Sequence, residues 1–133
     1  MDKNYSVMQI GTFGKDLAAK GRIMAGEQLG LTGCEVSFNY SPAGTFTPFV
    51  HSHKQNEETY IVISGTGMFM AGGEEFPITE GSVIRVAPAA DRAIKAGETD
   101  LSFICIQAKA GSLTQASGDD GVITEAKASW MAE

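Results

Sequence analysis

Short apolar segments separated by glycine-containing turns limit the fold of this chain more than any other feature. Residues 34–41 alternate apolar and polar side chains, and residues 59–65, 82–88 and 101–111 are rich in β-branched or apolar residues. Turn-forming groups follow them, among them Gly72-Gly73 at the centre of an expected hairpin. Short strands at nearly regular spacing predict an all-β fold, a sandwich or a barrel. Only residues 15–28 have the pattern of a helical turn, and their glycines weaken it.

Composition restricts the partners of the protein. The chain has 133 residues with 43% hydrophobic content, which suits a single domain over residues 1–133. A net charge of -6, without a cluster of Lys and Arg, argues against nucleic acid as a partner. No apolar run is long enough to span a bilayer and the N-terminus lacks the regions of a signal peptide, so we expect a cytoplasmic protein. We expect Cys34 and Cys105 to be reduced core residues.

Both histidines of the chain, His51 and His53, stand one residue apart. In an extended strand, residues i and i+2 point to the same face, so the two imidazoles would project side by side. Glu57 and Glu58 follow after a polar turn and begin the next apolar segment. If the two segments are antiparallel neighbours, whichever glutamate faces the histidines completes a set of two imidazoles and one carboxylate. Such a set suits zinc, iron, nickel or manganese.

The segment around these residues resembles the first motif of the cupin superfamily, in which HxH is followed by Glu and then by Gly. His51, His53, Glu58 and Gly65 fall on the motif positions, while Gly44 lies one residue further from His51 than usual. The resemblance covers roughly residues 30–110 and leaves an acidic tail at 111–133. It implies a single antiparallel β-barrel of jelly-roll type, with an interior site in which His51, His53 and Glu58 bind a divalent transition metal.

The second cupin motif is similar to residues 81–92, with Gly81 and Pro88 recognisable, but Arg92 occupies the position of the final histidine. A guanidinium stays protonated and has no lone pair for a metal. Any metal would therefore have three protein ligands and open positions, and Arg92 would bind a substrate carboxylate or phosphate. The alternative is a metal-free site in which Arg92 pairs with Glu58, so that the arginine and the metal compete for this carboxylate.

Alternation along the predicted strands orients further residues. Tyr60 and Val62 share the parity of Glu58 and should line the interior, where Tyr60 serves the core or also presents its hydroxyl to the substrate. Glu57 should lie at the rim, and Arg92 should point inward. Residues 101–107 are apolar on both faces, so the N-terminal segment, the tail or a second subunit should cover the outer face; a homodimer is one expectation.

Two function classes remain open. The first is a small metal-dependent enzyme, of oxygenase or isomerase type, whose ion binds a small anionic organic molecule. The second is a metal-free module that binds a small molecule without catalysis. Because cupin-like folds serve both roles, the fold does not decide between them.

Overall fold

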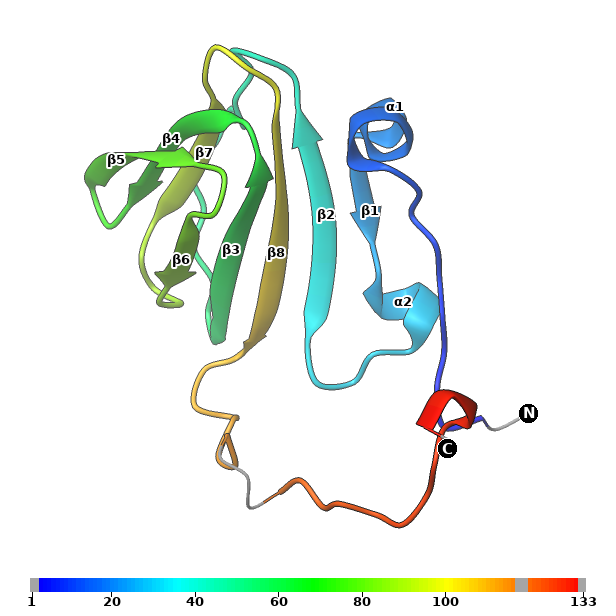
Figure 1. The fold of residues 1–133 in the computed structure, drawn as a ribbon. Coiled ribbons are helices and arrows are strands. Elements are labelled where there is room, and N and C mark those ends of the chain that lie inside the picture. The colour runs from blue at the N-terminus through cyan, green and yellow to red at the C-terminus, as the bar shows by residue number, and fades with distance from the viewer. Residues whose placement is uncertain (1–2, 117–119, 132–133) are drawn as a thin grey trace.

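The computed structural model describes residues 3–116 and 120–131. Its strands form two antiparallel sheets that face each other (Figure 1). The five-stranded sheet has the order β1-β2-β8-β3-β6 and the three-stranded sheet has the order β5-β4-β7. The strands are β1 (Arg22–Met24), β2 (Glu35–Ser41), β3 (Asn56–Ser64), β4 (Thr66–Ala71), β5 (Glu74–Thr79), β6 (Val83–Val86), β7 (Arg92–Ala96) and β8 (Leu101–Lys109). The prediction of an all-β, antiparallel jelly-roll fold is confirmed, although the two sheets stay separate in their backbone hydrogen bonding.

The helical pieces are short and lie mainly before β2. They are the π-helical turn η1 (Phe13–Leu17), α1 (Ala18–Lys20), α2 (Gly26–Leu29) and the 3-10 turn η2 (Ser129–Met131). Glycines at 21 and 30 have positive φ and end α1 and α2, which agrees with the weak helical pattern seen in the sequence. None of the helices in the described part of the chain has the length and apolar character needed to cross a membrane.

The hydrophobic core lies between the two sheets. Alternate residues of the strands point into it, because successive side chains of a strand face opposite sides. Its buried members are Tyr60, Val62, Phe69, Ile78, Val86, Ala96, Leu101, Phe103 and Cys105. The predicted inward orientation of Tyr60, Val62 and Arg92 is confirmed, since these side chains are 6%, 2% and 1% exposed.

The predicted hairpin forms between β4 and β5. Gly72 and Gly73 have φ values of +59° and +86°, as a two-residue turn with positive φ at both positions requires. Cys34 and Cys105 are both free, as expected, but only Cys105 is buried. Cys34 lies just before β2 and is half-buried, so its assignment to the core was wrong.

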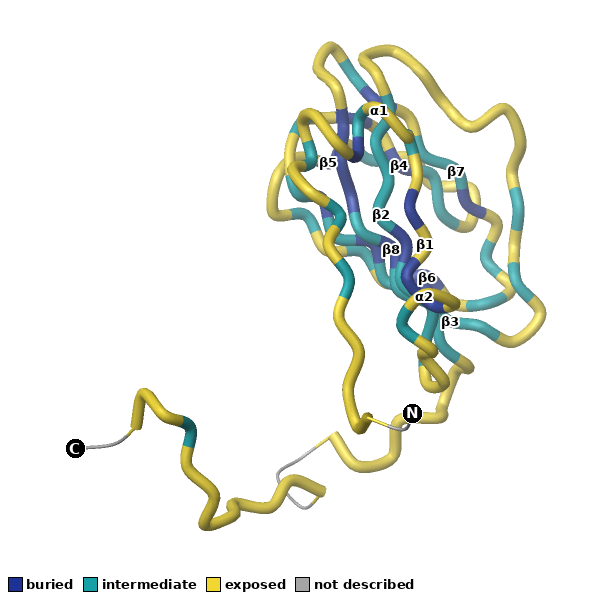
Figure 2. The backbone as a smooth tube through the Cα atoms, turned by 90° about the vertical axis from the view of Figure 1, so that its right-hand side faces the viewer, coloured by how far each residue is buried: buried dark blue, intermediate teal, exposed yellow. Residues whose placement is uncertain are grey.

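The N-terminal segment covers one end of the outer face of the five-stranded sheet. Leu17 is fully buried, and the ring of Phe13 meets that of Phe38 edge to face, with centroids 6.2 Å apart. The described parts of the acidic tail, residues 111–116 and 120–131, lie outside both sheets (Figures 1 and 2). Trp130 is 82% exposed, so it does not anchor the tail to the body of the molecule.

Candidate metal centre

His51 and His53 lie in the irregular segment between β2 and β3. The sequence predicted a regular strand here, but the backbone pairs with its neighbours at only a few points. His51 forms an isolated bridge with Arg92, and its carbonyl accepts a hydrogen bond from the Arg92 N–H at 2.9 Å. The N–H of His53 donates to the carbonyl of Pro88 at 2.8 Å. These bonds fix the backbone on both sides of the pair and bring the two imidazole centroids to 5.3 Å from each other.

Glu58, near the start of β3, completes the predicted set of ligands. One ligand atom from each of His51, His53 and Glu58 lies within 4.8 Å of the others. His51 Nδ1 and His53 Nε2 are buried and have no hydrogen-bond partner among the described residues, although His53 Nε2 lies 3.2 Å from Glu58 Oε2. Buried polar atoms without partners are costly. Two imidazole nitrogens and one carboxylate oxygen this close together form a donor set that suits a transition-metal ion.

The two oxygens of Glu58 have different partners. Oε1 accepts hydrogen bonds from the Tyr60 hydroxyl and from Arg92 Nη1, each at 2.7 Å. Oε2 faces His53. A metal at Oε2 and the arginine at Oε1 can therefore be present together, and the competition for this carboxylate that we expected from the sequence is not required by the geometry.

Arg92 is almost completely buried, with 1% of its surface exposed. Besides the bond to Glu58, its Nη2 lies 2.8–2.9 Å from the carbonyl oxygens of Ala87, Pro88 and Ala90. The side chain thus ties the loop between β6 and β7 to the carboxylate of β3. This geometry does not support the prediction that Arg92 binds a substrate anion directly, and it gives the arginine a positioning role.

Tyr60 belongs to the core and also contacts the candidate centre, while its predicted contact with a substrate stays a prediction. Its ring packs against Phe69 and Phe103, with centroids 4.9 and 5.9 Å apart, while its hydroxyl donates to Glu58. Burial raises the pKa of Tyr60, so the phenol stays protonated and remains a donor. Cys105 lies directly opposite Tyr60 on β8, and burial together with the nearby charge of Glu58 raises the pKa of its thiol to about 12. The parity of β8 was the only signal that could have placed Cys105 at the site.

The charges of the centre suit metal binding. Burial raises the pKa of Glu58, but hydrogen bonds from Tyr60 and Arg92 together outweigh it and hold the pKa below its ordinary value. Burial lowers the pKa of His51 and so favours the neutral imidazole. An ionised carboxylate and a neutral imidazole are the forms that bind a metal ion.

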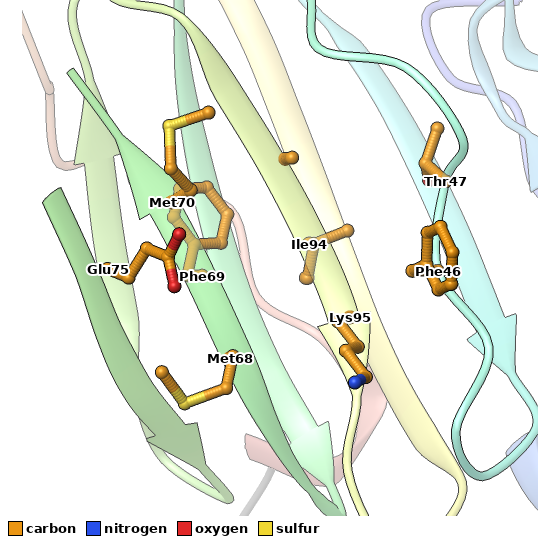
Figure 3. A pocket seen from close by; sticks show the side chains of 9 residues that line it. Phe46, Thr47, Met68, Phe69, Met70, Glu75, Ile94 and Lys95 are labelled. Atoms are coloured by element: carbon orange, nitrogen blue, oxygen red, sulfur yellow. The ribbon is translucent and has the colours of Figure 1, made fainter. Parts of the chain in front are cut away.

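Two other features lie apart from this centre. Glu57 points to the opposite side of β3, where its half-exposed side chain is 3.6 Å from Arg85. A hollow of about 410 Å³ lies over β4 and β7, with Phe46, Met68, Met70 and Lys95 around it (Figure 3). None of the predicted site residues lines this hollow.

Comparison with known proteins identifies the family. The sequence profile of the cupin domain matches residues 37–107, which include all the residues of the candidate centre. The chain belongs to the cupin family. A crystal structure of a cupin protein from Bacteroides fragilis is similar to this cupin over 92% of the present chain and 99% of its own, with 43% identity and a TM-score of 0.84.

More distant structures support the cupin fold. A predicted oxalate decarboxylase from Thermotoga maritima shares 27% identity, with 56% of this chain and 64% of that chain covered and a TM-score of 0.53. A protein from Photorhabdus luminescens matches 79% of this chain and 89% of its own at 16% identity, with a TM-score of 0.64, and shows the fold alone. No curated protein matches this cupin.

Proposed function

We propose that this cupin binds a divalent transition metal through His51, His53 and Glu58 and holds a small anionic organic molecule at the open positions of the ion. The observation that carries the proposal is the pair of buried imidazole nitrogens, His51 Nδ1 and His53 Nε2, which lack partners among the described residues and converge on Glu58. Zinc, iron, nickel and manganese all suit two nitrogens and one carboxylate oxygen.

Different residues of the chain have different roles at the proposed centre. Arg92 and Tyr60 hold Oε1 of Glu58, which leaves Oε2 directed towards the histidines. Such hydrogen bonds orient a ligand and tune its basicity. The ion, when bound, would supply a Lewis acid with open positions. A divalent ion, one Glu and one Arg carry about two net positive charges, which favours a carboxylate ligand.

The comparison with the predicted oxalate decarboxylase supports a carboxylate as the ligand, because that relative is named for a small dicarboxylate. The open positions would also suit an oxygenase or an isomerase. Turnover of a bound carboxylate by the metal-loaded protein would distinguish an enzyme from a binding protein.

A metal-free binding module is the second candidate, and one observation favours it. The buried charge of Glu58 already has a guanidinium and a phenol as partners, so the carboxylate is balanced without an ion. In that case the unpartnered histidine nitrogens would bind polar groups of an organic ligand.

Metal analysis of the purified protein and titration with zinc or nickel test the proposal. We expect the native protein to bind one ion per chain and the His51→Ala, His53→Ala double variant to bind none. Glu57→Gln is the matched control, because its carboxylate belongs to the same strand but pairs with Arg85 on the other side. A native protein that binds neither ion would favour the metal-free module.

We also propose that a second copy of the chain covers the outer face of the five-stranded sheet. One row of paired residues crosses all five strands on this face, and all its members are apolar: Ile23, Phe38, Ile104, Ile61 and Val83. The N-terminal segment covers one end, where Ile23 is 8% exposed, but Val83 at the other end is 66% exposed. A half-covered apolar row supports the homodimer expected from the sequence.

A further inference from the structure

Gln107 of β8 lies directly opposite Glu58 of β3 in the five-stranded sheet. Residues directly opposite each other on antiparallel strands point to the same face, with their Cβ atoms about 4.5–5.5 Å apart. Glu58 is buried on the interior face, where it belongs to the candidate centre, so the side chain of Gln107 leaves β8 on that face as well. Gln107 is therefore an immediate neighbour of one of the three candidate metal ligands.

The carboxamide of Gln107 is held by the protein at its oxygen. Oε1 accepts a hydrogen bond from Asn56 Nδ2 at 2.9 Å. Asn56 is two residues before Glu58 on β3, so its side chain lies on the same face of the sheet. The bond fixes which end of the amide is turned to Asn56. Nε2 of Gln107 forms no hydrogen bond with any residue of the described ranges 3–116 and 120–131, so its two protons are available to a ligand.

The neighbouring donors already bind other groups of the protein. The hydroxyl of Tyr60 and Nη1 of Arg92 both donate to Oε1 of Glu58, while Nε and Nη2 of Arg92 donate to backbone carbonyls. A carboxylate that binds an ion through one oxygen has a second oxygen, and a hydrogen bond to such a charged acceptor is stronger than one between neutral groups. The free Nε2 of Gln107 can supply this hydrogen bond.

A small molecule can reach the amide. Gln107 and Asn56 are both half-buried, and they line a hollow of about 910 Å³ together with residues of α2 and of the segment that leads into β2. Glu35 lies directly opposite Gln107 on its other side, on β2. This carboxylate does not occupy the amide, because its Oε1 accepts hydrogen bonds from the backbone N–H groups of Gly26 and Val36.

We propose that Gln107 selects a carboxylate at the metal centre. Its Nε2 donates to the ligand oxygen that does not bind the ion, and Asn56 positions the amide for this contact. The inference rests on the proposed function and names the donor that the anionic molecule meets there. The ligand class is a small organic acid with two oxygen acceptors on one carbon. The positive charge of the centre attracts the anion, and the neutral amide adds a requirement for the second oxygen.

NMR titration of the zinc-loaded, ¹⁵N-labelled protein with acetate and with imidazole tests this assignment. Acetate brings a second oxygen acceptor beside the one that binds zinc, whereas zinc-bound imidazole presents only an N–H donor. We expect Gln107→Leu to weaken acetate binding about tenfold, as for the loss of a hydrogen bond to a charged group, and to leave imidazole and zinc binding unchanged. Asn56→Ala should weaken acetate binding less, because the donor remains. Gln55→Leu makes the same change at an exposed position and is the matched control.

Three results would overturn the inference: an unchanged acetate affinity in Gln107→Leu, an equal loss of acetate and imidazole binding in that variant, or the same loss of acetate binding in Gln55→Leu. A second measurement keeps the test independent of the metal. In the metal-free protein, acetate should shift the side-chain amide signals of Gln107, which are identified by their absence from Gln107→Leu. If the native protein binds no zinc, the proposed function fails while these signals still decide on Gln107, and unmoved signals contradict its role.

Discussion

At the scale of single residues, the side chain of Arg92 bears on the candidate centre through its hydrogen bond to the carboxylate of Glu58. A histidine at this position would offer a lone pair to the metal, while the arginine offers only donors. The structure gives these donors to Glu58 and to three backbone carbonyls. The arginine would therefore act on a metal bound at this centre through the carboxylate that it holds.

Arg92→Met should destabilise the protein and weaken its metal site. Without the guanidinium, the buried carboxylate of Glu58 keeps only its hydrogen bond from Tyr60, and three backbone carbonyls lose their donor. Breaking a buried ion pair costs about 3–5 kcal/mol. Zinc affinity should fall about 10- to 100-fold, as for other groups that orient a metal ligand. Urea denaturation and zinc titration measure the two effects.

Arg85→Met is the control for this change, because Arg85 forms a surface pair with Glu57 across 3.6 Å and its side chain is 68% exposed. Its removal should change the free energy of unfolding by no more than about 1 kcal/mol. Zinc binding that is unchanged or tighter in Arg92→Met would show that the arginine competes with the metal for Glu58 after all.

At the scale of elements, Gly65 joins β3 to β4 at a point where two backbones approach closely. Its φ is +91°, and a Cβ there would lie 1.9 Å from the carbonyl oxygen of Asp100. Gly44 has a similar φ of +76°, but a Cβ there would meet nothing within 4 Å. Substitutions at these two glycines therefore separate the energetic cost of a positive φ from that of a steric clash.

Gly65→Ala should lower the free energy of unfolding by about 3 kcal/mol or more, since strain in the left-handed region and overpacking add. Gly44→Ala should cost only about 1–2 kcal/mol, because it suffers the strain alone. Urea denaturation of both variants measures the difference, and equal losses would contradict the close approach at Gly65.

Strands with a clear alternation could be predicted from the sequence, and the rest could not. The parity of β3 placed Glu58, Tyr60 and Val62 on the core side, and the double glycine gave the β4–β5 hairpin. Strand β1 was missed because it has only three residues and lies between short helical turns. The hydrogen bonds from Arg92 to the loop carbonyls could not be predicted, because the sequence of this loop has no periodic pattern of apolar and polar residues.

At the scale of the whole molecule, the outer face of the five-stranded sheet is covered at one end and exposed at the other. The row from Ile23 to Val83 loses its cover towards β6, and the described part of the tail does not fold back over it (Figure 2). Because an exposed apolar surface of this kind favours association, the mass in solution should be twice the 14.0 kDa of one chain.

Light scattering after size-exclusion chromatography tests this expectation with charge substitutions on the row. Val83→Lys and Ile61→Lys place an ammonium group at its exposed end and should convert the dimer to a monomer, because an unpaired charge in an apolar interface is costly. Met68→Lys is the control, since Met68 is 39% exposed on the outer side of the other sheet and should leave the dimer intact. A native protein that elutes as a monomer would contradict the dimer. A dimer that only Met68→Lys disrupts would place the interface elsewhere on the molecule.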